Sequence, residues 1–473
     1  MRELKSILHA GPSKMDRESR PKRWWRVGLA LLVWTCCGSP GGSNGDCSFS
    51  ILTRTISPMM ATVGIVEWST TMSNLASAQI VYSLDGAGPG VLNTGGTAPV
   101  DLTKPAYRTW LLGLKPSSDY TFHVEATDTA GATCESPSYP LPTTGALPQA
   151  PKVTRTVYQA ATQARGFIVT SSGLTYGNFA VIIDADGTVV WYAVTPNQCT
   201  RARMDYEGVN MWMVAVNDDN SGGEMRFVSM DGQTVMTNIS GLSRAHHDFA
   251  VLPGKIAAMA WTNDDVDPPS ELVELSSDGS GAPTPVFEIG ANLYVGNTYE
   301  GQPSNNTYHC NSILYHPVDD SFTIGDRYPN LYVKVSHAGA LRWQFGGSCA
   351  DAPAGANHCV AEGWQQNHGH HLLDDGTMLL FNNDSPRASH VLQFALSTAA
   401  TLSATLVEDF SSGDRSSNVL GDVQRLPNGN TLISYSTDGA LLEVDPSWAP
   451  VQEVKGTYGY ADWRASLYGP PPR

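Results

Sequence analysis

From position 181 the chain reads Val181-Ile-Ile-Asp-Ala-Asp-Gly-Thr-Val-Val-Trp191. Apolar, β-branched runs on both sides of an Asp-Gly turn predict an antiparallel hairpin. The pattern returns at intervals of 45 to 60 residues. A period of this length fits four-stranded blades, so the six copies predict an all-β chain with a six-bladed β-propeller over residues 150–473. The later copies are Arg226–Val235, Leu272–Gly279, Leu331–Trp343, Val391–Leu396 and Leu441–Pro446.

A second pattern lies between these hairpins and places histidines at one register. His247, His309 and His368 each stand five positions before a Leu in a predicted inner strand. The aligned strand Gly421–Leu426 has Gly in that position. Equivalent positions of successive blades surround one axis, so we expect the three imidazoles to converge at one mouth of a central channel.

Three imidazoles around one point have two common uses in proteins. They ligate a metal ion, or they supply a nucleophile together with acid–base and electrostatic partners. The chain continues from His309 to Asn311, and the same repeat then reaches Gly325-Asp-Arg327. A guanidinium matches an oxyanion and repels a metal ion, so Arg327 favours an anionic ligand and predicts no metal here.

The same residues resemble the sulfate-binding signature of the arylsulfate sulfotransferase family. That signature is His-x-Asn-Ser-Ile with an Arg on the next strand, and this chain has His309-Cys-Asn-Ser-Ile313 and Arg327. Asn367-His368, eight residues before a turn Gly, resembles the segment with the family's nucleophilic His, and Val423–Ile433 resembles its last blade. The resemblance covers residues 150–470 and implies a six-bladed propeller preceded by a β-sandwich.

The resemblance also implies an activity. The family moves a sulfuryl group from a phenolic sulfate ester to an acceptor phenol and uses no 3′-phosphoadenosine cofactor. By this resemblance His368 attacks the sulfur and forms a sulfohistidine. Arg327, Asn311 and His309 would hold the sulfuryl oxygens. His247 would exchange the proton with the departing and incoming phenols.

Neighbouring histidines leave assignments open on two strands. His246 stands beside His247 and could take its role. His370 shares strand parity with His368, which makes it a further candidate for contact with substrate in the channel. His371 is expected to face the other way and to be structural.

The chain departs from the family pattern at two places. Asn367 replaces the usual Gln before the nucleophile, and Phe381-Asn-Asn-Asp384 stands where the family tends to have Phe-Asp-Asn-Gly, so that Asn382 replaces an Asp. Two alternatives stay open. One is a catalytically silent propeller that binds a sulfated or other anionic ligand at the same mouth. The other is a metal-dependent hydrolase or lyase that uses the three histidines.

Residues 47–141 predict a separate β-sandwich. The segment Thr62–Trp68 alternates apolar and polar residues, and Tyr120, Phe122, Val124 and Ala126 share one face of a second strand. A Leu six residues before this Tyr resembles the fibronectin type III domain, in which Tyr120 would form the tyrosine corner. Such a domain is expected to be a spacer or docking module without chemistry of its own.

The first 37 residues predict an export signal. Basic residues over Arg20–Arg26 precede the short apolar run Val27–Thr35, which is too short to span a bilayer. Cys36 follows and resembles the acylated residue of a bacterial lipoprotein, with residues 38–46 as a flexible tether. The alternative is ordinary signal-peptide cleavage and free secretion. Either way we expect an extracytoplasmic protein in the periplasm or at the cell surface, which meets a membrane only through this anchor.

Cysteine use and charge complete the sequence evidence. In an exported chain, Cys47 with Cys134 and Cys349 with Cys359 are expected to form disulfides, and Cys199 with Cys310 remains by elimination.

Lys and Arg total 29 against 45 Asp and Glu, a formal net charge of −16. An acidic chain of this kind argues against nucleic acid as a partner, because phosphate binding requires clustered Lys and Arg.

Overall fold

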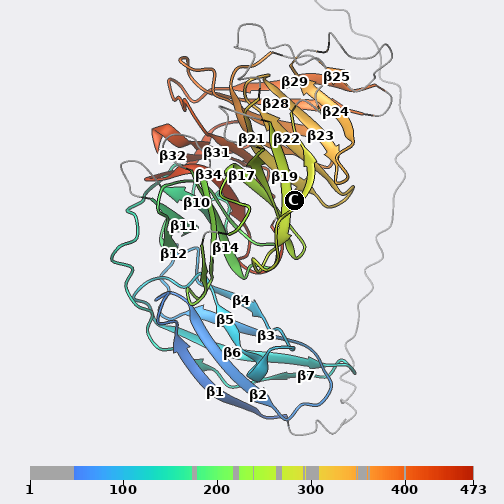
Figure 1. Ribbon diagram of the computed structural model, residues 1–473. Helices are drawn as coiled ribbons and strands as arrows, with labels where there is room; N and C mark the ends of the chain where they lie inside the picture. Colours follow the sequence, from blue (N-terminus) through green and yellow to red (C-terminus); the bar gives the residue numbers. More distant parts are fainter. Residues whose placement is uncertain are drawn as a thin grey trace, which may run out of the picture. The chain divides into compact units, whose positions relative to one another are not determined.

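The computed structural model describes residues 47–172, 178–216, 223–237, 239–262, 269–290, 293, 308–347, 349, 359–360, 363–398 and 401–471. The chain forms β-strands over most of these ranges (Figure 1), and its described helical segments are two three-residue 3-10 turns, η1 (Pro105–Tyr107) and η3 (Ser436–Asp438). No helix among the described residues is long and apolar enough to cross a membrane. Cys36 and the tether over residues 38–46 lie outside the described residues.

Two antiparallel sheets pack face to face near the N-terminus and enclose one core. In the strand β6 (Tyr120–Asp128) buried and half-buried residues alternate, which places Tyr120 in this core with Trp68. The backbone N–H of Lys115 donates to Tyr120 Oη over 2.8 Å. The first sheet contains β1 (Phe49–Ile56), β2 (Gly64–Thr70) and β5 (Thr109–Leu111), and the second contains β4 (Gly95–Pro99), β3 (Leu75–Leu84), β6, β7 (Thr133–Glu135) and β8 (Tyr139–Pro140).

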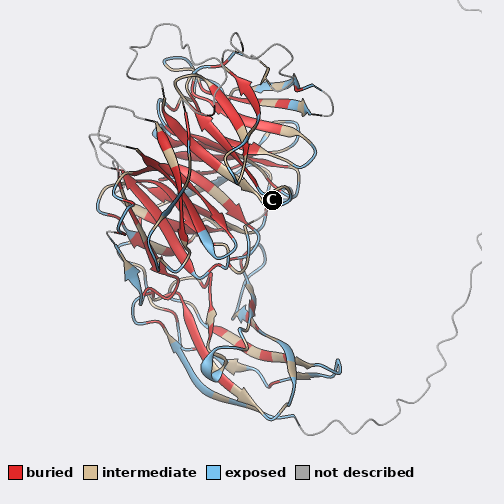
Figure 2. Cartoon of the chain, turned by 45° about the vertical axis from the view of Figure 1, so that its right-hand side comes forward, coloured by how far each residue is buried: buried red, intermediate tan, exposed pale blue. Residues whose placement is uncertain are grey.

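Six further sheets occupy the described residues from 154 to 464, and each contains one of the six expected hairpins as outer strands. The innermost strands are β34 (Tyr458–Arg464), β13 (Gln198–Met204), β17 (Ala245–Leu252), β21 (Cys310–His316), β26 (Asn367–Leu372) and β30 (Asp422–Arg425). Each inner strand contacts the next, and β30 contacts β34, so the ring closes as a β-propeller. Figure 2 shows that buried residues run through most strands of the propeller.

The outer strands of the six blades follow in chain order. The first blade adds β10 (Phe167–Ser172), β11 (Phe179–Asp184) and β12 (Val189–Val194), and the second adds β14 (Asn210–Val216), β15 (Gly223–Ser229) and β16 (Val235–Met236). The third adds β18 (Lys255–Trp261), β19 (Ser270–Ser276) and β20 (Thr284–Glu288), and the fourth adds β22 (Ser321–Asp326), β23 (Leu331–Ser336), β24 (Leu341–Gly346) and β25 (Cys359–Val360). The fifth adds β27 (Thr377–Asn382), β28 (His390–Ser397) and β29 (Ser403–Phe410), and the sixth adds β31 (Thr431–Tyr435), β32 (Ala440–Val444), β33 (Pro450–Lys455) and β9 (Thr154–Val157).

Strands from the two ends of the repeat region pair with each other's blades and close the ring. The last strand, β34, pairs with β10 and becomes the inner strand of the first blade. The early strand β9 pairs with β33 at the outer edge of the last blade. The repeat pattern did not predict β9, because it is a single strand that precedes the first hairpin.

A buried ionic cluster joins the inner strands around the axis. Arg201 Nε lies 2.7 Å from Asp248, and its Nη1 lies 3.1 Å from Asp422 and 3.2 Å from Asp462. Arg203 Nε lies 2.6 Å from the same Asp462. Burial alone would lower the pKa of Arg201, but the three carboxylates together raise it above its ordinary value. The guanidinium therefore stays charged and connects four blades through β13, β17, β30 and β34.

The cysteines correct one sequence prediction. Cys47 forms a disulfide with Cys134, and Cys349 forms one with Cys359. The predicted pair of Cys199 and Cys310 is wrong, because both are buried thiols that form no disulfide. They lie on the inner strands β13 and β21, which belong to blades separated by the blade of β17. Two disulfides fit an extracytoplasmic location.

The buried His371 predicts a loss of stability in acid. Burial lowers the pKa of His371 to about 4, and its Nδ1 accepts a hydrogen bond from the Arg425 N–H over 2.9 Å. In the unfolded chain the same imidazole has a pKa near 6.5 and binds a proton below that pH, whereas the folded ring stays neutral down to about pH 4. The free energy of unfolding is therefore at its full value above pH 6.5 and falls as the pH falls towards 4. Between about pH 7 and pH 4.5 this group should remove about 2 kcal/mol from the free energy of unfolding.

His371→Gln keeps a hydrogen-bond acceptor but cannot titrate. Urea unfolding at both pH values should therefore show a smaller acid loss in the variant than in the wild type. An equal loss in the two proteins would contradict this account of His371.

Candidate active site

The three aligned histidines lie at the beginnings of successive inner strands. His247 is in β17, His309 immediately precedes β21, and His368 is in β26. The pairing register of β17 and of β26 shifts around the histidine, and that of β21 shifts two residues after His309. β-Bulges of this kind re-aim side chains and are frequent beside active sites.

His247 and His309 are in direct contact. Their Nε2 atoms lie 3.1 Å apart, and their rings are nearly perpendicular, with centroids 4.7 Å apart. The backbone of His247 has a φ of 53°, a left-handed conformation that is uncommon for residues other than glycine. Its Nδ1 lies 2.9 Å from Nδ1 of His246, whose Nε2 lies 2.9 Å from Ser270 Oγ. The contacts form a continuous chain along which a proton can pass.

His246 lies behind His247 in this chain. Its ring is fully buried and stacks on Trp261, with centroids 4.5 Å apart and an interplanar angle of 19°. Because the ring nitrogens contact Ser270 and His247, the structure gives His246 a supporting position. Direct contact between His246 and a substrate has no support in this geometry.

His368 is held by its Nδ1 atom. This nitrogen lies 2.6 Å from Asn383 Oδ1 and 3.2 Å from the carbonyl oxygen of Gln366. The Asn383 amide in turn donates from Nδ2 to the carbonyls of Ser417 and Leu420 over 2.6 and 2.8 Å. His368 itself is almost completely buried.

Electrostatics keep the two principal imidazoles neutral. Burial lowers the pKa of His368 well below its usual range, and the charge of Arg327 lowers it further. Burial likewise lowers the pKa of His247, with smaller effects from His309, His368 and Arg327 among others. A neutral imidazole has the free lone pair that a nucleophile or base requires.

Arg327 and Asn311 reach the same end of the fourth blade. Arg327 follows β22, and its backbone N–H donates to the His309 carbonyl over 3.0 Å. Asn311 lies at the register shift of β21 and is fully buried. Its Nδ2 donates to the Asn367 carbonyl over 2.7 Å, and its Oδ1 has no hydrogen-bond partner among the described residues.

The position of His370 corrects the expectation based on strand parity. Its Nδ1 lies 3.0 Å from Ser312 Oγ, and its Nε2 lies 2.8 Å from Thr323 Oγ1. The register shift between Asn367 and His370 interrupts the alternation of the strand, so His370 does not share the environment of His368. Burial lowers the pKa of His370, and the further effects come from His316, His371, Arg201 and Arg203 rather than from His368 or Arg327, so we give it no role with substrate.

Several important residues were missed from the sequence. Asn383 lies within a segment that was compared with the family pattern, yet nothing in the sequence connected it with His368. Arg201 and Arg203 carried a usable signal, because two arginines alternate along β13, a strand with no other charged residue. Tyr460, whose hydroxyl donates to the Asn311 carbonyl, comes from the closing strand β34 and had no signal.

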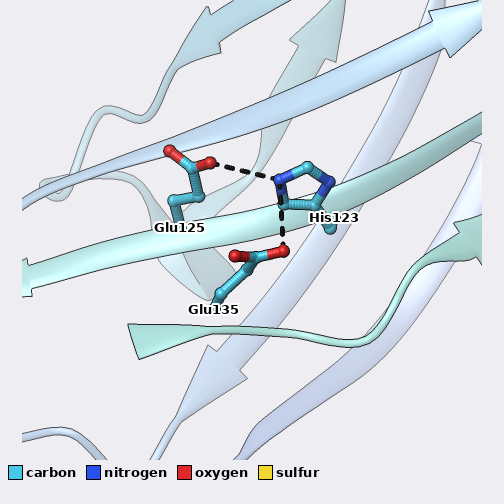
Figure 3. A group of neighbouring side chains, drawn as sticks. All are labelled: His123, Glu125 and Glu135. Carbon is cyan, nitrogen blue, oxygen red and sulfur yellow. Dashed lines mark hydrogen bonds and ion pairs between the residues drawn. The ribbon is translucent and has the colours of Figure 1, made fainter. Parts of the chain in front are cut away.

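Figure 3 shows a separate cluster of His123, Glu125 and Glu135 in the N-terminal sheets. Among the described residues, this is the one group of three or more His, Cys, Asp or Glu side chains whose possible metal-ligand atoms lie within 4.8 Å of one another. His123 Nε2 lies 3.2 Å from Glu125 and 3.7 Å from Glu135, which oppose each other across β6 and β7. The imidazole lies between two opposed carboxylates and contacts both, so these side-chain contacts account for the cluster.

A cavity of about 430 Å³ lies at the other ends of the inner strands. Val251, Leu314 and Leu372 line it, together with Pro471 from the C-terminal segment. The three aligned histidines lie at the beginnings of those same strands. The chemistry of the histidines, rather than the size of this cavity, therefore identifies the candidate site.

The fold and the site define a β-propeller with buried His and Asn side chains at the beginnings of its inner strands and a half-buried Arg327 at the same end of the fourth blade. The family model described as "Arylsulfotransferase (ASST)" matches residues 282–455, less than half of the chain. The matched range includes His309, Arg327, His368 and Asn383 but not His247. No curated protein matches the chain.

Solved structures resemble the chain only distantly. A protein of unknown function from Bacteroides caccae has 13% identity and a TM-score of 0.42, with 63% of this chain and 98% of that chain covered. The Cps50 (Swd1) β-propeller domain of Myceliophteria thermophila has 10% identity and a TM-score of 0.41, with 67% and 93% covered. A catalytically inactive virginiamycin B lyase from Staphylococcus aureus, with quinupristin, has 9% identity and a TM-score of 0.37, with 64% and 88% covered. Likeness at this level identifies no activity.

Proposed function

We propose that the protein is an arylsulfotransferase, which moves a sulfuryl group from a phenolic sulfate ester to an acceptor phenol without a 3′-phosphoadenosine cofactor. The family match over residues 282–455 supports this reaction class. One observation carries the proposal: His368, the contacting pair of His247 and His309, and Arg327, which binds the His309 backbone, lie at the same end of three successive blades. This set combines a nucleophile, proton-transfer groups and a cation for an anionic substrate.

In the first half-reaction, Nε2 of His368 attacks the sulfur of the aryl sulfate. The N–S bond forms as the S–O bond to the aryl group breaks, and the electron pair leaves with the phenolate oxygen. Arg327, His309 and the Asn311 amide hold the three sulfuryl oxygens, where fixed donors stabilise the transferring group. The substrate's negative charge raises the pKa of the nearby His247, which then protonates the departing phenolate.

In the second half-reaction, the oxygen of an acceptor phenol attacks the sulfur of the sulfohistidine. The new S–O bond forms as the N–S bond breaks, which restores neutral His368. His247 accepts the phenol proton, and its contacts with His309 and His246 offer that proton two onward positions. One imidazole thus acts as acid and then as base.

The remaining parts of the chain receive supporting roles in this proposal. Residues 150–473 form the catalytic propeller, and residues 47–141 form a fibronectin type III-like spacer or docking domain. The two disulfides support an extracytoplasmic location. Acylation of Cys36 would hold the protein at a membrane surface.

This mechanism predicts ping-pong kinetics. The donor phenol leaves before the acceptor reacts, so initial rates at several fixed acceptor concentrations should give parallel double-reciprocal lines against the aryl sulfate. Lines that intersect to the left of the axis would indicate a ternary complex and contradict the covalent intermediate. A protein that binds aryl sulfate with no turnover under any acceptor would instead be a silent binding propeller.

A further inference from the structure

We propose that Asn383 is a positioning residue that fixes the reactive nitrogen of His368. Its side-chain amide holds the imidazole in the tautomer with the proton on Nδ1, so the lone pair is on Nε2. The naming of Nε2 as the attacking atom rests on the proposed function. The tautomer itself follows from the hydrogen bonds alone.

The orientation of the Asn383 amide is determined by two backbone carbonyls. Its Nδ2 lies 2.6 Å from the carbonyl oxygen of Ser417 and 2.8 Å from that of Leu420. Carbonyl oxygens only accept hydrogen bonds, so the NH2 group must face them and Oδ1 must face His368. In the opposite orientation Oδ1 would face the two carbonyl oxygens, and these three buried acceptors would have no donor.

The tautomer of His368 follows from this orientation. Its Nδ1 faces the Oδ1 of Asn383 at 2.6 Å and the carbonyl oxygen of Gln366 at 3.2 Å. Both partners are acceptors, so Nδ1 must carry the proton and donate. A neutral imidazole has one N–H, and the lone pair is therefore on Nε2. Burial, Arg327 and His309 all favour the neutral ring over the imidazolium.

The surrounding chain holds Asn383 in place. Asn383 directly follows β27 and is fully buried, and its carbonyl accepts a hydrogen bond from Ser389 Oγ over 3.0 Å. The Leu420 carbonyl that it binds precedes Gly421, which has a φ of 106°. A side chain at Gly421 would meet the Phe381 ring at 2.3 Å. This explains why the fourth aligned strand has glycine where the others have histidine.

Three variants separate positioning from charge and from folding. Asn383→Leu removes the acceptor and should lower kcat about 10- to 100-fold while KM for the aryl sulfate changes little. Asn383→Asp keeps an acceptor and adds a negative charge, which favours the imidazolium. It should therefore move the acid limb of the kcat/KM profile to higher pH by about one unit or more.

Asn382→Asp is the matched control. It adds the same charge one residue away, where the wild-type side chain accepts a hydrogen bond from the Gln365 N–H over 2.9 Å rather than contacting His368. In this control the acid limb of the kcat/KM profile should stay within a few tenths of a pH unit of its wild-type position. Equal shifts in the two Asp variants would overturn the positioning role.

The decisive experiment is nitrogen NMR of the full chain with labelled histidine rings, in which His368→Gln identifies the signal. The proposal predicts a neutral His368 protonated on Nδ1 in the wild type and mixed tautomers in Asn383→Leu. A wild-type ring protonated on Nε2, or a tautomer unchanged in Asn383→Leu, would overturn it. This readout needs no turnover, so the inference and the proposed sulfuryl transfer can fail separately.

Discussion

His368→Ala is expected to abolish sulfuryl transfer, with kcat reduced by about a thousandfold or more. The variant lacks the nitrogen that accepts the sulfuryl group, and no neighbouring ring replaces it. The ring nitrogens of His370 contact Ser312 and Thr323, and His247 is the proposed acid–base group. Steady-state transfer from a chromogenic aryl sulfate to a phenol measures the effect.

The matched control for this prediction is His371→Gln. His371 lies on the same strand, but it lines the cavity at the far end of the inner strands and bonds to the Arg425 backbone. Its replacement should leave kcat within about threefold of the wild type. If His368→Ala retained kcat within about tenfold, while still folded, the proposed nucleophile would be wrong.

Arg201→Met is expected to cause the largest loss of stability, about 3–5 kcal/mol in the free energy of unfolding. The guanidinium is almost fully buried between Asp248 and Asp422, and its removal leaves both carboxylates without their principal cation. Asp462 keeps Arg203 as a partner. Burial already raises the pKa of Asp422 to about 6, which shows how weakly its charge is supported even with Arg201 present.

Arg342→Met is the control for this second prediction. Arg342 lies 3.2 Å from Asp319, but both side chains are more than a third exposed. Exposed ion pairs are screened by water, so this variant should lose less than about 1 kcal/mol. Urea unfolding of both variants at neutral pH compares the two losses. Similar losses would show that the axial ionic cluster does not hold the blades together.

The repeated hairpin was sufficient to predict the blades, because each copy contains its own turn and its own apolar faces. It could not predict how the ring closes. The strands β9 and β34 pair with partners about 300 residues away, and such pairing leaves no local pattern. The cysteine prediction failed for a related reason. Elimination paired Cys199 with Cys310 without knowing that a whole blade separates them.

The site was predictable as far as strand register was regular. Alignment on a shared Leu placed His247, His309 and His368 at the beginnings of successive inner strands, because each stands five residues before that Leu. Parity failed at His370, because a bulge adds residues that the alternating pattern cannot reveal. Asn383 was missed because its relation to His368 depends on the carbonyls of Ser417 and Leu420, from a different part of the chain.

The most direct test of the central claim is the intact mass of the purified protein after brief exposure to an aryl sulfate. The account predicts a gain of one SO₃ group, which disappears when a phenol is added and is absent in His368→Ala. Peptide mapping at neutral or higher pH should locate the group on His368. A gain that persists in His368→Ala, or turnover of the donor with no gain at any time, would contradict transfer through a sulfohistidine at this residue.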